Sequence, residues 1–187
     1  MPSARKCPAA LLAVALVLLP LAGCNSKSAA TPANFIVGLN AHFADHPDCL
    51  LPDPAFPDPP AFPFETTDEA KTLQMNALAD AQLLTVEVER DINASRYTTT
   101  EAGARVAPRF CYGHRVVSSI DSFTPPATAN GFPETEVAYH YTMEDVPVWA
   151  KSEAMRAAFP ALTFDTSGAP SGKATLAGTM AGWQVPD

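Results

Sequence analysis

Residues 135–143 read Thr-Glu-Val-Ala-Tyr-His-Tyr-Thr-Met, so a large apolar side chain recurs at every second position. In an extended chain, side chains two residues apart point to the same face. Four apolar side chains therefore share one face: Val137, Tyr139, Tyr141 and Met143. This alternation predicts a β-strand that buries one side, and it is the clearest strand signal in the chain.

The segments around this strand predict the rest of a sheet. Residues 110–123 are rich in β-branched side chains, and residues 173–185 predict one or two strands interrupted by glycines. Before the latter, Pro147 opens a predicted helix that Pro160 stops. We therefore expect an antiparallel β-β-α-β unit in the second half of the chain.

The first half of the chain predicts helices. Residues 31–44 begin with Thr-Pro, a helix-entry signal, and continue with apolar residues at helical spacing. Thr66 and Glu69 form a capping-box pattern that opens a second helix, which should end near Gln82. A short strand at 86–88 follows. The chain as a whole therefore predicts an α+β fold, with N-terminal helices before the sheet unit.

Part of this first half resembles the helix and wing of winged-helix proteins. The resemblance covers residues 69–103 and is carried by Leu73, Leu78, Leu83, Leu84, Tyr97, Thr99 and Gly103. The helix contains Glu69, Asp80 and only Lys71, so it lacks the basic face that reads DNA. We therefore take the resemblance to concern architecture alone.

Residues 50–64 contain six prolines, which exclude a helix or a central strand. Phe56, Phe62 and Phe64 make the stretch too apolar for a free linker. One interpretation is an extended strap packed over the domain. The other is a polyproline ligand for the aromatic groove of a partner.

The N-terminus predicts export. Arg5 and Lys6 precede an apolar run at 9–19, which is too short to span a bilayer and suits a secretory signal peptide. The next residues, Leu21-Ala22-Gly23-Cys24, resemble the lipobox of bacterial lipoproteins. The resemblance implies that residues 1–23 are removed and that Cys24 receives a diacylglycerol and an N-acyl chain. An ordinary signal peptide cut near Ala22 is the alternative.

The resemblance to lipoproteins also implies a location. Asn25 is not the aspartate that goes with inner-membrane retention, which favours the outer membrane of a Gram-negative cell, facing the periplasm. In a Gram-positive cell the protein would lie on the outer face of the cell membrane. Residues 24–31 are small and polar and predict a flexible tether. We expect a short helix and proline-rich strap at 32–65 and a single α+β domain at 66–187.

The charge of the chain excludes one class of partner. The chain has 12 basic and 20 acidic residues, and removal of residues 1–23 leaves 10 basic residues and a net charge of −10. Binding to nucleic acid needs clustered Lys and Arg, and anionic headgroups repel an acidic chain. We therefore expect membrane attachment through the lipid and no nucleic-acid partner.

The cysteines predict one disulfide. Cys7 leaves with the signal peptide and Cys24 carries the lipid, so Cys49 and Cys111 remain. In an oxidising envelope compartment, two remaining cysteines are expected to pair with each other.

Familiar catalytic motifs, including phosphate loops and metalloprotease signatures, are absent from the sequence. His42, His46 and Cys49 are residue types that zinc or copper binds. However, Cys49 is expected to pair with Cys111, and two histidines alone make a weak metal site. We therefore interpret them as a solvated helix end and predict no metal site. The same pairing weakens a thiol–imidazole pair of Cys111 and His114.

A hydroxyl nucleophile with a base and an orienting acid could come from Ser118, Ser119 and Asp121, with His114 or His140. Such residues occur by chance in any protein of this size, so the sequence assigns no catalytic residue. Whether the chain is an enzyme stays open.

Four aromatic residues could line a ligand groove, although such residues more often form core: Tyr139, Tyr141, Trp149 and Trp183. We predict a lipid-anchored envelope protein that binds another envelope component, either a protein or a small molecule, with no cofactor beyond its covalent lipid. An envelope hydrolase that uses Ser or Cys with His is the alternative.

Overall fold

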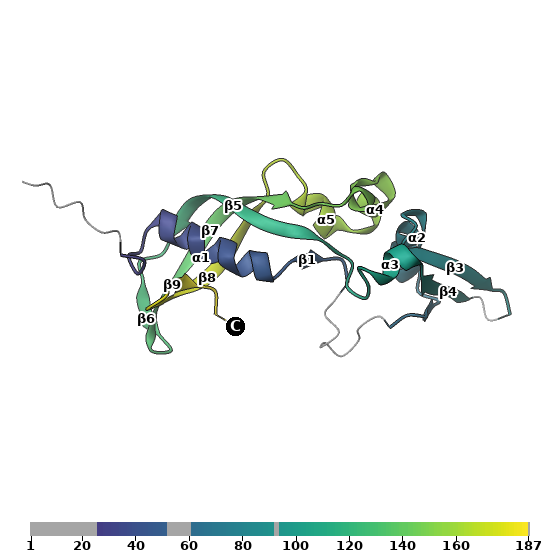
Figure 1. Cartoon of the computed structure of the whole chain (residues 1–187), viewed down its shortest axis with the longest axis horizontal. Coiled ribbons are helices and arrows are strands. Elements are labelled where there is room, and N and C mark those ends of the chain that lie inside the picture. Colours follow the sequence, from purple (N-terminus) through teal and green to yellow (C-terminus); the bar gives the residue numbers. More distant parts are fainter. Residues whose placement is uncertain (1–25, 52–60, 92–93, 187) are drawn as a thin grey trace, which may run out of the picture.

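The computed structural model describes residues 26–51, 61–91 and 94–186 and shows a mixed α+β fold with two antiparallel sheets (Figure 1). The larger sheet has the strand order β1-β5-β7-β8-β9, and β6 pairs with β7. Its strands are β1 (Asp48–Cys49), β5 (Cys111–Phe123), β6 (Ala127–Ala129), β7 (Phe132–Glu144), β8 (Ser171–Thr179) and β9 (Gly182–Gln184).

The central strand β7 confirms the alternation of residues 135–143. Val137, Tyr139 and Tyr141 are buried. On the opposite face, Glu136 and Thr142 are exposed and the residues between them are partly buried. β5 begins at Cys111 rather than at residue 110, because Phe110 has a positive φ of 51° and cannot continue an extended strand.

Helix α1 (Pro32–Asp45) covers one face of this sheet. Thr31 caps it, since its hydroxyl accepts a hydrogen bond from Asn34 N (3.3 Å). Phe35 and Leu39 are completely buried against the apolar face of the sheet. A Cβ on Gly38 would lie 2.1 Å from Trp183 O, so only glycine allows this close approach of helix and strand. We call residues 26–49 and 111–186 the sheet lobe.

A second lobe is inserted into the chain between β1 and β5, and we call the described residues between 50 and 110 the inserted lobe. It contains a three-stranded sheet of order β2-β4-β3 together with two helices. Its elements are β2 (Phe64–Thr66), α2 (Glu69–Asp80), β3 (Leu84–Glu89), β4 (Ala94–Thr99) and α3 (Glu101–Ala104). Figure 1 shows β3 and β4 at one end of the molecule and the start of α1, beside β6, at the other.

The capping box predicted at Thr66 and Glu69 is wrong, because Asp68 is the N-cap of α2. Asp68 Oδ1 accepts a hydrogen bond from Lys71 N (2.8 Å), while Thr66 Oγ1 accepts one from Asp68 N (3.0 Å). Thr66 therefore shapes the turn before the helix. The helix ends at Asp80, two residues before the predicted position.

Three short helices follow β7: η1 (Val148–Lys151), α4 (Glu153–Ala158) and α5 (Pro160–Asp165). The sequence predicted a single helix that Pro160 stops. In the structure the helix is already interrupted at Ser152, which caps α4, and Pro160 begins α5, because proline fits the first turn of a helix. Met155 and Leu162 are completely buried and belong to the same apolar cluster as Leu78 and Tyr97 of the inserted lobe.

The described end of the proline-rich stretch packs on the inserted lobe. Phe64 lies in β2 opposite Tyr97, and the ring of Phe62 lies 5.7 Å from that of Phe110. Both phenylalanines are partly buried, as a strap requires. Phe56 and most of the prolines lie outside the described residues.

The segment predicted as a flexible tether is hydrogen-bonded to the sheet lobe from Ser26 onward. Asn34 Nδ2 donates to Ser26 O (3.0 Å) and Ala29 O (2.8 Å), and Trp183 Nε1 also donates to Ala29 O (3.1 Å). Within the residues that the structure covers, every helix is too short or too polar to cross a membrane.

Candidate functional site

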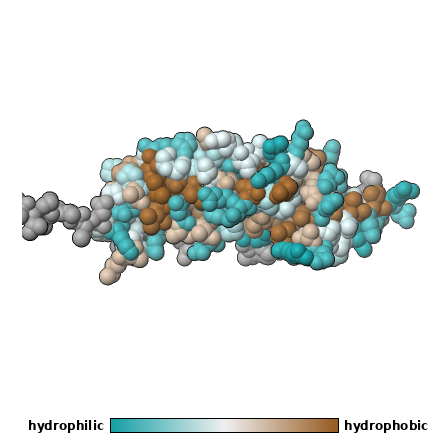
Figure 2. Space-filling view, turned by 45° about the horizontal axis from the view of Figure 1, so that its top comes forward, coloured by the Kyte–Doolittle hydropathy of each residue, from teal (hydrophilic) through white to brown (hydrophobic). Residues whose placement is uncertain are grey.

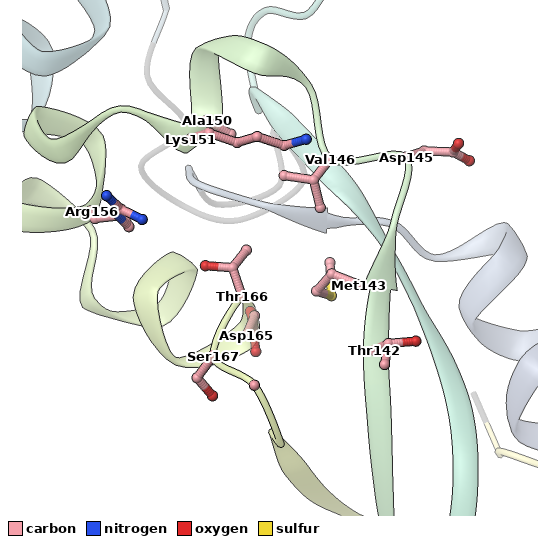
Figure 3. A pocket seen from close by; sticks show the side chains of 11 residues that line it. Thr142, Met143, Asp145, Val146, Ala150, Lys151, Arg156, Asp165, Thr166 and Ser167 are labelled. Atoms are coloured by element: carbon pink, nitrogen blue, oxygen red, sulfur yellow. The ribbon is translucent and has the colours of Figure 1, made fainter.

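A pocket of about 690 Å³ lies between the end of β7, helices η1 and α4, and the turn after α5 (Figure 3). Met143, Val146 and Ala150 provide its apolar lining. Thr142, Asp145, Asp165, Thr166, Ser167 and Gly168 complete it, together with Lys151 and Arg156. The pocket therefore combines an apolar surface with charged and hydroxyl groups.

Two cations belong to the pocket. Figure 3 shows Lys151 extending from η1 and Arg156 directed toward the pocket from α4. Both side chains are exposed, and neither forms an ion pair with another residue of the described chain. The lining therefore contains two cations, beside the carboxylates of Asp145 and Asp165, and the two cations are available to pair with a bound anion.

Asp165 connects the pocket with the interior. Its carboxylate is buried and accepts hydrogen bonds from Tyr112 Oη, through Oδ2, and from Tyr141 Oη (2.5 Å), through Oδ1. Burial, followed by hydrogen bonding to Asp165, raises the pKa of Tyr112 and that of Tyr141 above the ordinary value for tyrosine. Both phenols therefore stay protonated at neutral pH and act as donors to Asp165.

Arg115 of β5 offsets the negative charge of the carboxylates beneath the pocket. Its Nε and Nη2 donate to the two carboxylate oxygens of Asp48 (3.0 and 2.7 Å), and Nη2 lies 3.9 Å from Asp165 Oδ1. The guanidinium also lies 4.9 Å from the ring centre of Tyr141 and 5.5 Å from that of Phe43. One cation is thus shared by two carboxylates and two aromatic rings.

The pKa values of this pair reflect opposing causes. Burial raises the pKa of Asp48, and the hydrogen bonds and charge of Arg115 offset the rise only in part. Burial would lower the pKa of Arg115, but hydrogen bonding and attraction to Asp48 outweigh it, so the pKa rises. Arg115 therefore remains a cation throughout the accessible pH range.

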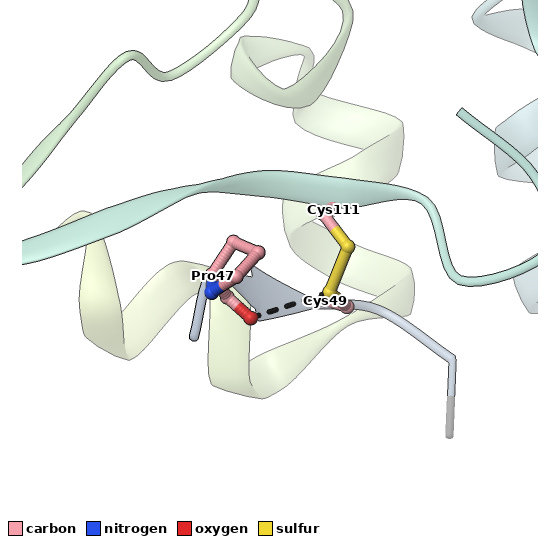
Figure 4. Close-up of a disulfide and its surroundings, with 3 residues drawn as sticks. All are labelled: Pro47, Cys49 and Cys111. Atoms are coloured by element: carbon pink, nitrogen blue, oxygen red, sulfur yellow. Dashed lines mark hydrogen bonds between the residues drawn. A yellow bond between two sulfur atoms is a disulfide. The ribbon is translucent and has the colours of Figure 1, made fainter. Parts of the chain in front are cut away.

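The predicted disulfide between Cys49 and Cys111 is present (Figure 4). It joins the end of β1 to the start of β5, beside Pro47, whose carbonyl oxygen lies 3.3 Å from Cys49 Sγ. Because Asp48 immediately precedes Cys49, the bond also holds Asp48 beside Arg115. The disulfide therefore helps to position the Asp48–Arg115 ion pair that lies beneath the pocket.

The structure does not bring the four predicted groove residues together. Tyr139, Tyr141 and Trp183 are buried in the cluster under α1, whereas Trp149 is partly buried against the other cluster. Among these rings, Tyr141 reaches the candidate site, through its hydrogen bond to Asp165. The three buried rings have little surface left for a ligand, because α1 covers them.

The two histidines considered for metal binding lie at the C-terminal end of α1. The rings of His42 and His46 stack at 4.1 Å, and His46 Nδ1 lies 2.8 Å from His42 O, while Cys49 is in the disulfide. No group of three or more His, Cys, Asp or Glu side chains is placed to hold a metal ion within residues 26–51, 61–91 and 94–186.

The residues weighed for hydrolysis lie outside the pocket. His140 Nε2 lies 3.1 Å from Asp121 Oδ2, and its Nδ1 lies 3.3 Å from Pro170 O, so both ring nitrogens are engaged. Ser118 Oγ donates to the backbone carbonyl of His140 rather than to its ring (3.3 Å). Cys111 has no free thiol, and His114 faces Asp145 at 3.5 Å. This arrangement supplies no activated nucleophile.

The sequence reasoning missed the residues that form the site: Asp48, Arg115, Lys151, Arg156 and Asp165. They are ordinary charged residues without a motif, and each comes from a different element: β1, β5, η1, α4 and α5. One sequence feature could have indicated the site: Asp165 directly follows an apolar segment that contains Leu162 and Phe164, which favours a buried carboxylate.

No protein-family model, no curated protein and no solved structure matches this chain significantly, so its residues and their geometry alone carry the functional argument.

Proposed function

We propose that this protein is a lipid-anchored protein of the bacterial envelope that binds a small anionic molecule in the pocket beside Lys151 and Arg156. The observation that carries this proposal is the pair of cations, without ion-pair partners among the described residues, at one pocket. The volume of about 690 Å³ lies within the range of small-molecule sites in proteins.

The lining indicates the class of ligand. Met143, Val146 and Ala150 offer an apolar surface, while Lys151 and Arg156 favour a carboxylate, sulfonate or phosphate group. Of the two carboxylates in the lining, Asp165 already has Arg115 nearby and accepts hydrogen bonds from two tyrosines, and Asp145 lies 3.5 Å from the His114 ring. The ligand that fits best has a small apolar body and one anionic group.

The location proposed for the protein rests on the sequence. The lipobox-like residues 21–24 support lipidation of Cys24, and Asn25 supports outer-membrane sorting with the protein facing the periplasm. A diacylglycerol together with an N-acyl chain supplies more than the two acyl chains that hold a protein stably on a bilayer. Apart from this covalent lipid, the proposed function requires no cofactor and no nucleic-acid partner.

Two architectural proposals accompany this function. Helix α2, the β3–β4 hairpin and the pairing of β2 with β4 support a winged-helix-like arrangement at residues 69–103. The order β5, β7, helices, β8 supports the antiparallel β-β-α-β unit. Neither proposal changes the assignment of the pocket.

Binding can be tested with 8-anilinonaphthalene-1-sulfonate, a fluorescent probe with an apolar body and one anionic group. We expect the intact protein to bind it with micromolar affinity and the Lys151→Gln/Arg156→Gln double variant to bind about tenfold more weakly, as loss of two charge-assisted contacts implies. Lys173→Gln removes an exposed cation of β8, outside the pocket, and is the matched control. Equal affinity of all three proteins would refute the pocket assignment.

The location can be tested separately by intact-mass spectrometry of the protein purified from membranes. The mature chain should begin at Cys24 and carry the mass of three acyl chains and glycerol. Globomycin, which blocks lipoprotein signal peptidase, should cause the lipidated precursor to accumulate, and Cys24→Ser should release the protein from the membrane fraction. A chain without added acyl mass would refute the anchor.

A further inference from the structure

The first described residues lie against the start of α1, against β9 and against the turn between β8 and β9. Asn34 and Trp183 hold Ser26 and Ala29 by hydrogen bonds, and a Cβ on Gly182 would lie 3.5 Å from Lys27 O. Only Asn25 separates Ser26 from Cys24, so the two Cα atoms are at most about 7 Å apart. A membrane to which Cys24 is attached would therefore lie close to this end of the sheet.

Two turns lie side by side. One connects β6 to β7 at Asn130-Gly131, and the other connects β8 to β9 at Met180-Ala181. Glu134 pairs with Ala177, and a Cβ on Gly178 would lie 3.0 Å from Pro133 Cγ, so the start of β7 and the end of β8, with their turns, lie at the same end of the sheet. We call residues 26–31, 123–133 and 179–182 the turn end.

The turn end exposes apolar side chains. Met180 is fully exposed at the tip of a turn that Thr179 fixes, since Thr179 Oγ1 donates to Gly182 O (2.8 Å) and accepts from Ala181 N (3.1 Å). Phe132 is 49% exposed beside the neighbouring turn, and Phe123 is also exposed. Elsewhere apolar surface occurs as separate patches along the molecule (Figure 2).

The turn end is also nearly free of charge. The chain contains 20 acidic residues, yet residues 123–133 and 174–184 contain no charged residue, and residues 26–31 contain only Lys27. The neighbouring carboxylate of Glu134 accepts a hydrogen bond from Asn130 Nδ2 (3.2 Å). A surface with one cation and no carboxylate of its own can approach anionic headgroups that repel the rest of the chain.

We infer that the turn end rests on the bilayer that holds the lipid of Cys24, with Met180 and Phe132 in the headgroup region. The inference depends on the lipid anchor of the proposed function. The short connection to Cys24, the exposed apolar tip and the lack of charged residues at 123–133 and 174–184 each favour a lipid surface over water. The anchor and the turn end together fix the orientation of the molecule.

This orientation places the other functional surfaces away from the bilayer. β5 and β7 each have 13 residues, so they span about 40 Å from the turn end. The pocket lies at the opposite end of β7, and the inserted lobe lies beyond it (Figure 1). The pocket therefore opens where a ligand of the periplasm can reach it.

The inference can be tested on the lipidated, disulfide-bonded protein, which has no free thiol for labelling. Met180→Cys and the control Val88→Cys, both at exposed positions on opposite lobes, are labelled with the polarity-sensitive fluorophore NBD. Each protein is incorporated into vesicles of phosphatidylethanolamine and phosphatidylglycerol, with or without brominated acyl chains. We expect bromolipid to quench the label at 180 about threefold more than the label at 88, with a blue-shifted emission at 180 only.

Flotation of the vesicles separates the two possible failures. If neither protein floats with the vesicles, the lipid anchor is absent, and both the proposed location and the inference fall. If both proteins float but the two labels are quenched equally, the anchor stands and the docking of the turn end is refuted. A thermal unfolding curve unchanged from that of the unlabelled protein shows that each label leaves the fold intact.

Discussion

The two lobes of the molecule bury their apolar residues in different ways. In the sheet lobe, α1 lies directly on the sheet, and Phe35, Leu39 and Leu176 are completely buried. In the inserted lobe, the apolar cluster includes residues of α4 and α5, which belong to the other lobe. Val88 on β3 remains 66% exposed. The sheet lobe therefore has a core built from its own elements, whereas the inserted lobe depends on contacts across the junction.

The inserted lobe and the turn end of the sheet lobe also differ in charge. The inserted lobe forms surface ion pairs, in which Arg96 contacts Glu65 (2.5 Å) and Glu89 (3.1 Å). The turn end of the sheet lobe has no such groups. The comparison indicates that one end of the molecule suits water and soluble ligands, while the other suits a lipid surface.

The largest effect is expected at the junction between the lobes. The disulfide closes a loop with a sequence separation of 62, so replacing both cysteines by alanine (Cys49→Ala/Cys111→Ala) should lower the free energy of unfolding by about 4 kcal/mol. Urea unfolding of the soluble Cys24→Ser protein measures this change. Reduction of the parent protein with dithiothreitol should give the same loss, and an unchanged midpoint would contradict this role of the disulfide.

A buried leucine of α1 and an exposed leucine of α2 test the burial of these two helix positions. Leu39→Ala in α1 removes a completely buried side chain and should cost about 3 kcal/mol. Leu73→Ala in α2 removes a side chain that is 57% exposed and should change the free energy of unfolding by less than about 1 kcal/mol. Similar losses in urea unfolding would contradict the different burial of Leu39 and Leu73.

The buried network beneath the pocket predicts a dependence on alkaline pH. The pKa of Tyr112 lies above its ordinary value of 10 in the folded protein, so its contribution is complete below pH 10 and is lost as the pH rises above that value. Tyr112→Phe should cost about 2 kcal/mol at pH 7, because Asp165 loses a hydrogen bond. Above pH 10 the variant should lose stability less steeply than the parent, by roughly 1.4 kcal/mol per pH unit.

Urea unfolding at intervals between pH 8 and pH 11.5 measures both the offset and the slopes of this prediction. The Tyr97→Phe variant serves as the control, because Tyr97 is equally buried but its hydroxyl donates to the neutral amide of Asn76 (2.8 Å). Parallel pH profiles for the parent and Tyr112→Phe would contradict the assignment of Tyr112 as a donor to Asp165.

The smallest effect concerns the start of α2. Asp68→Ala removes the N-cap and should lower the free energy of unfolding by about 1 kcal/mol. Thr66→Ala removes only the hydrogen bond to Asp68 N and should cost less. The reverse order in urea unfolding would restore the capping box that the sequence predicted.

Much of the secondary structure could be predicted because it depends on local pattern. The alternation in β7 and the Thr-Pro start of α1 are properties of neighbouring residues, and the structure confirms both. The start of α2 and the break at Ser152 were missed, because several residues in each segment could serve as caps. Packing and turn geometry select among them.

The candidate site could not be predicted in the same way. Asp165 becomes a buried acceptor only because β5 and β7 bring Tyr112 and Tyr141 to it. Lys151 and Arg156 line one pocket although the extended backbone of Ser152 separates η1 from α4. The predicted aromatic residues Tyr139 and Trp183 became core because α1 covers them.

The sequence by itself determined the α+β class, the central strand and the pairing of Cys49 with Cys111, because local periodicity and the count of available cysteines are written in the chain. The tertiary structure alone decided that the described residues between 50 and 110 form an insertion, that Arg115 lies beside two carboxylates, and that the turn between β8 and β9 lies beside Lys27. These features depend on which distant segments pack together, and long-range packing leaves no local pattern in the sequence.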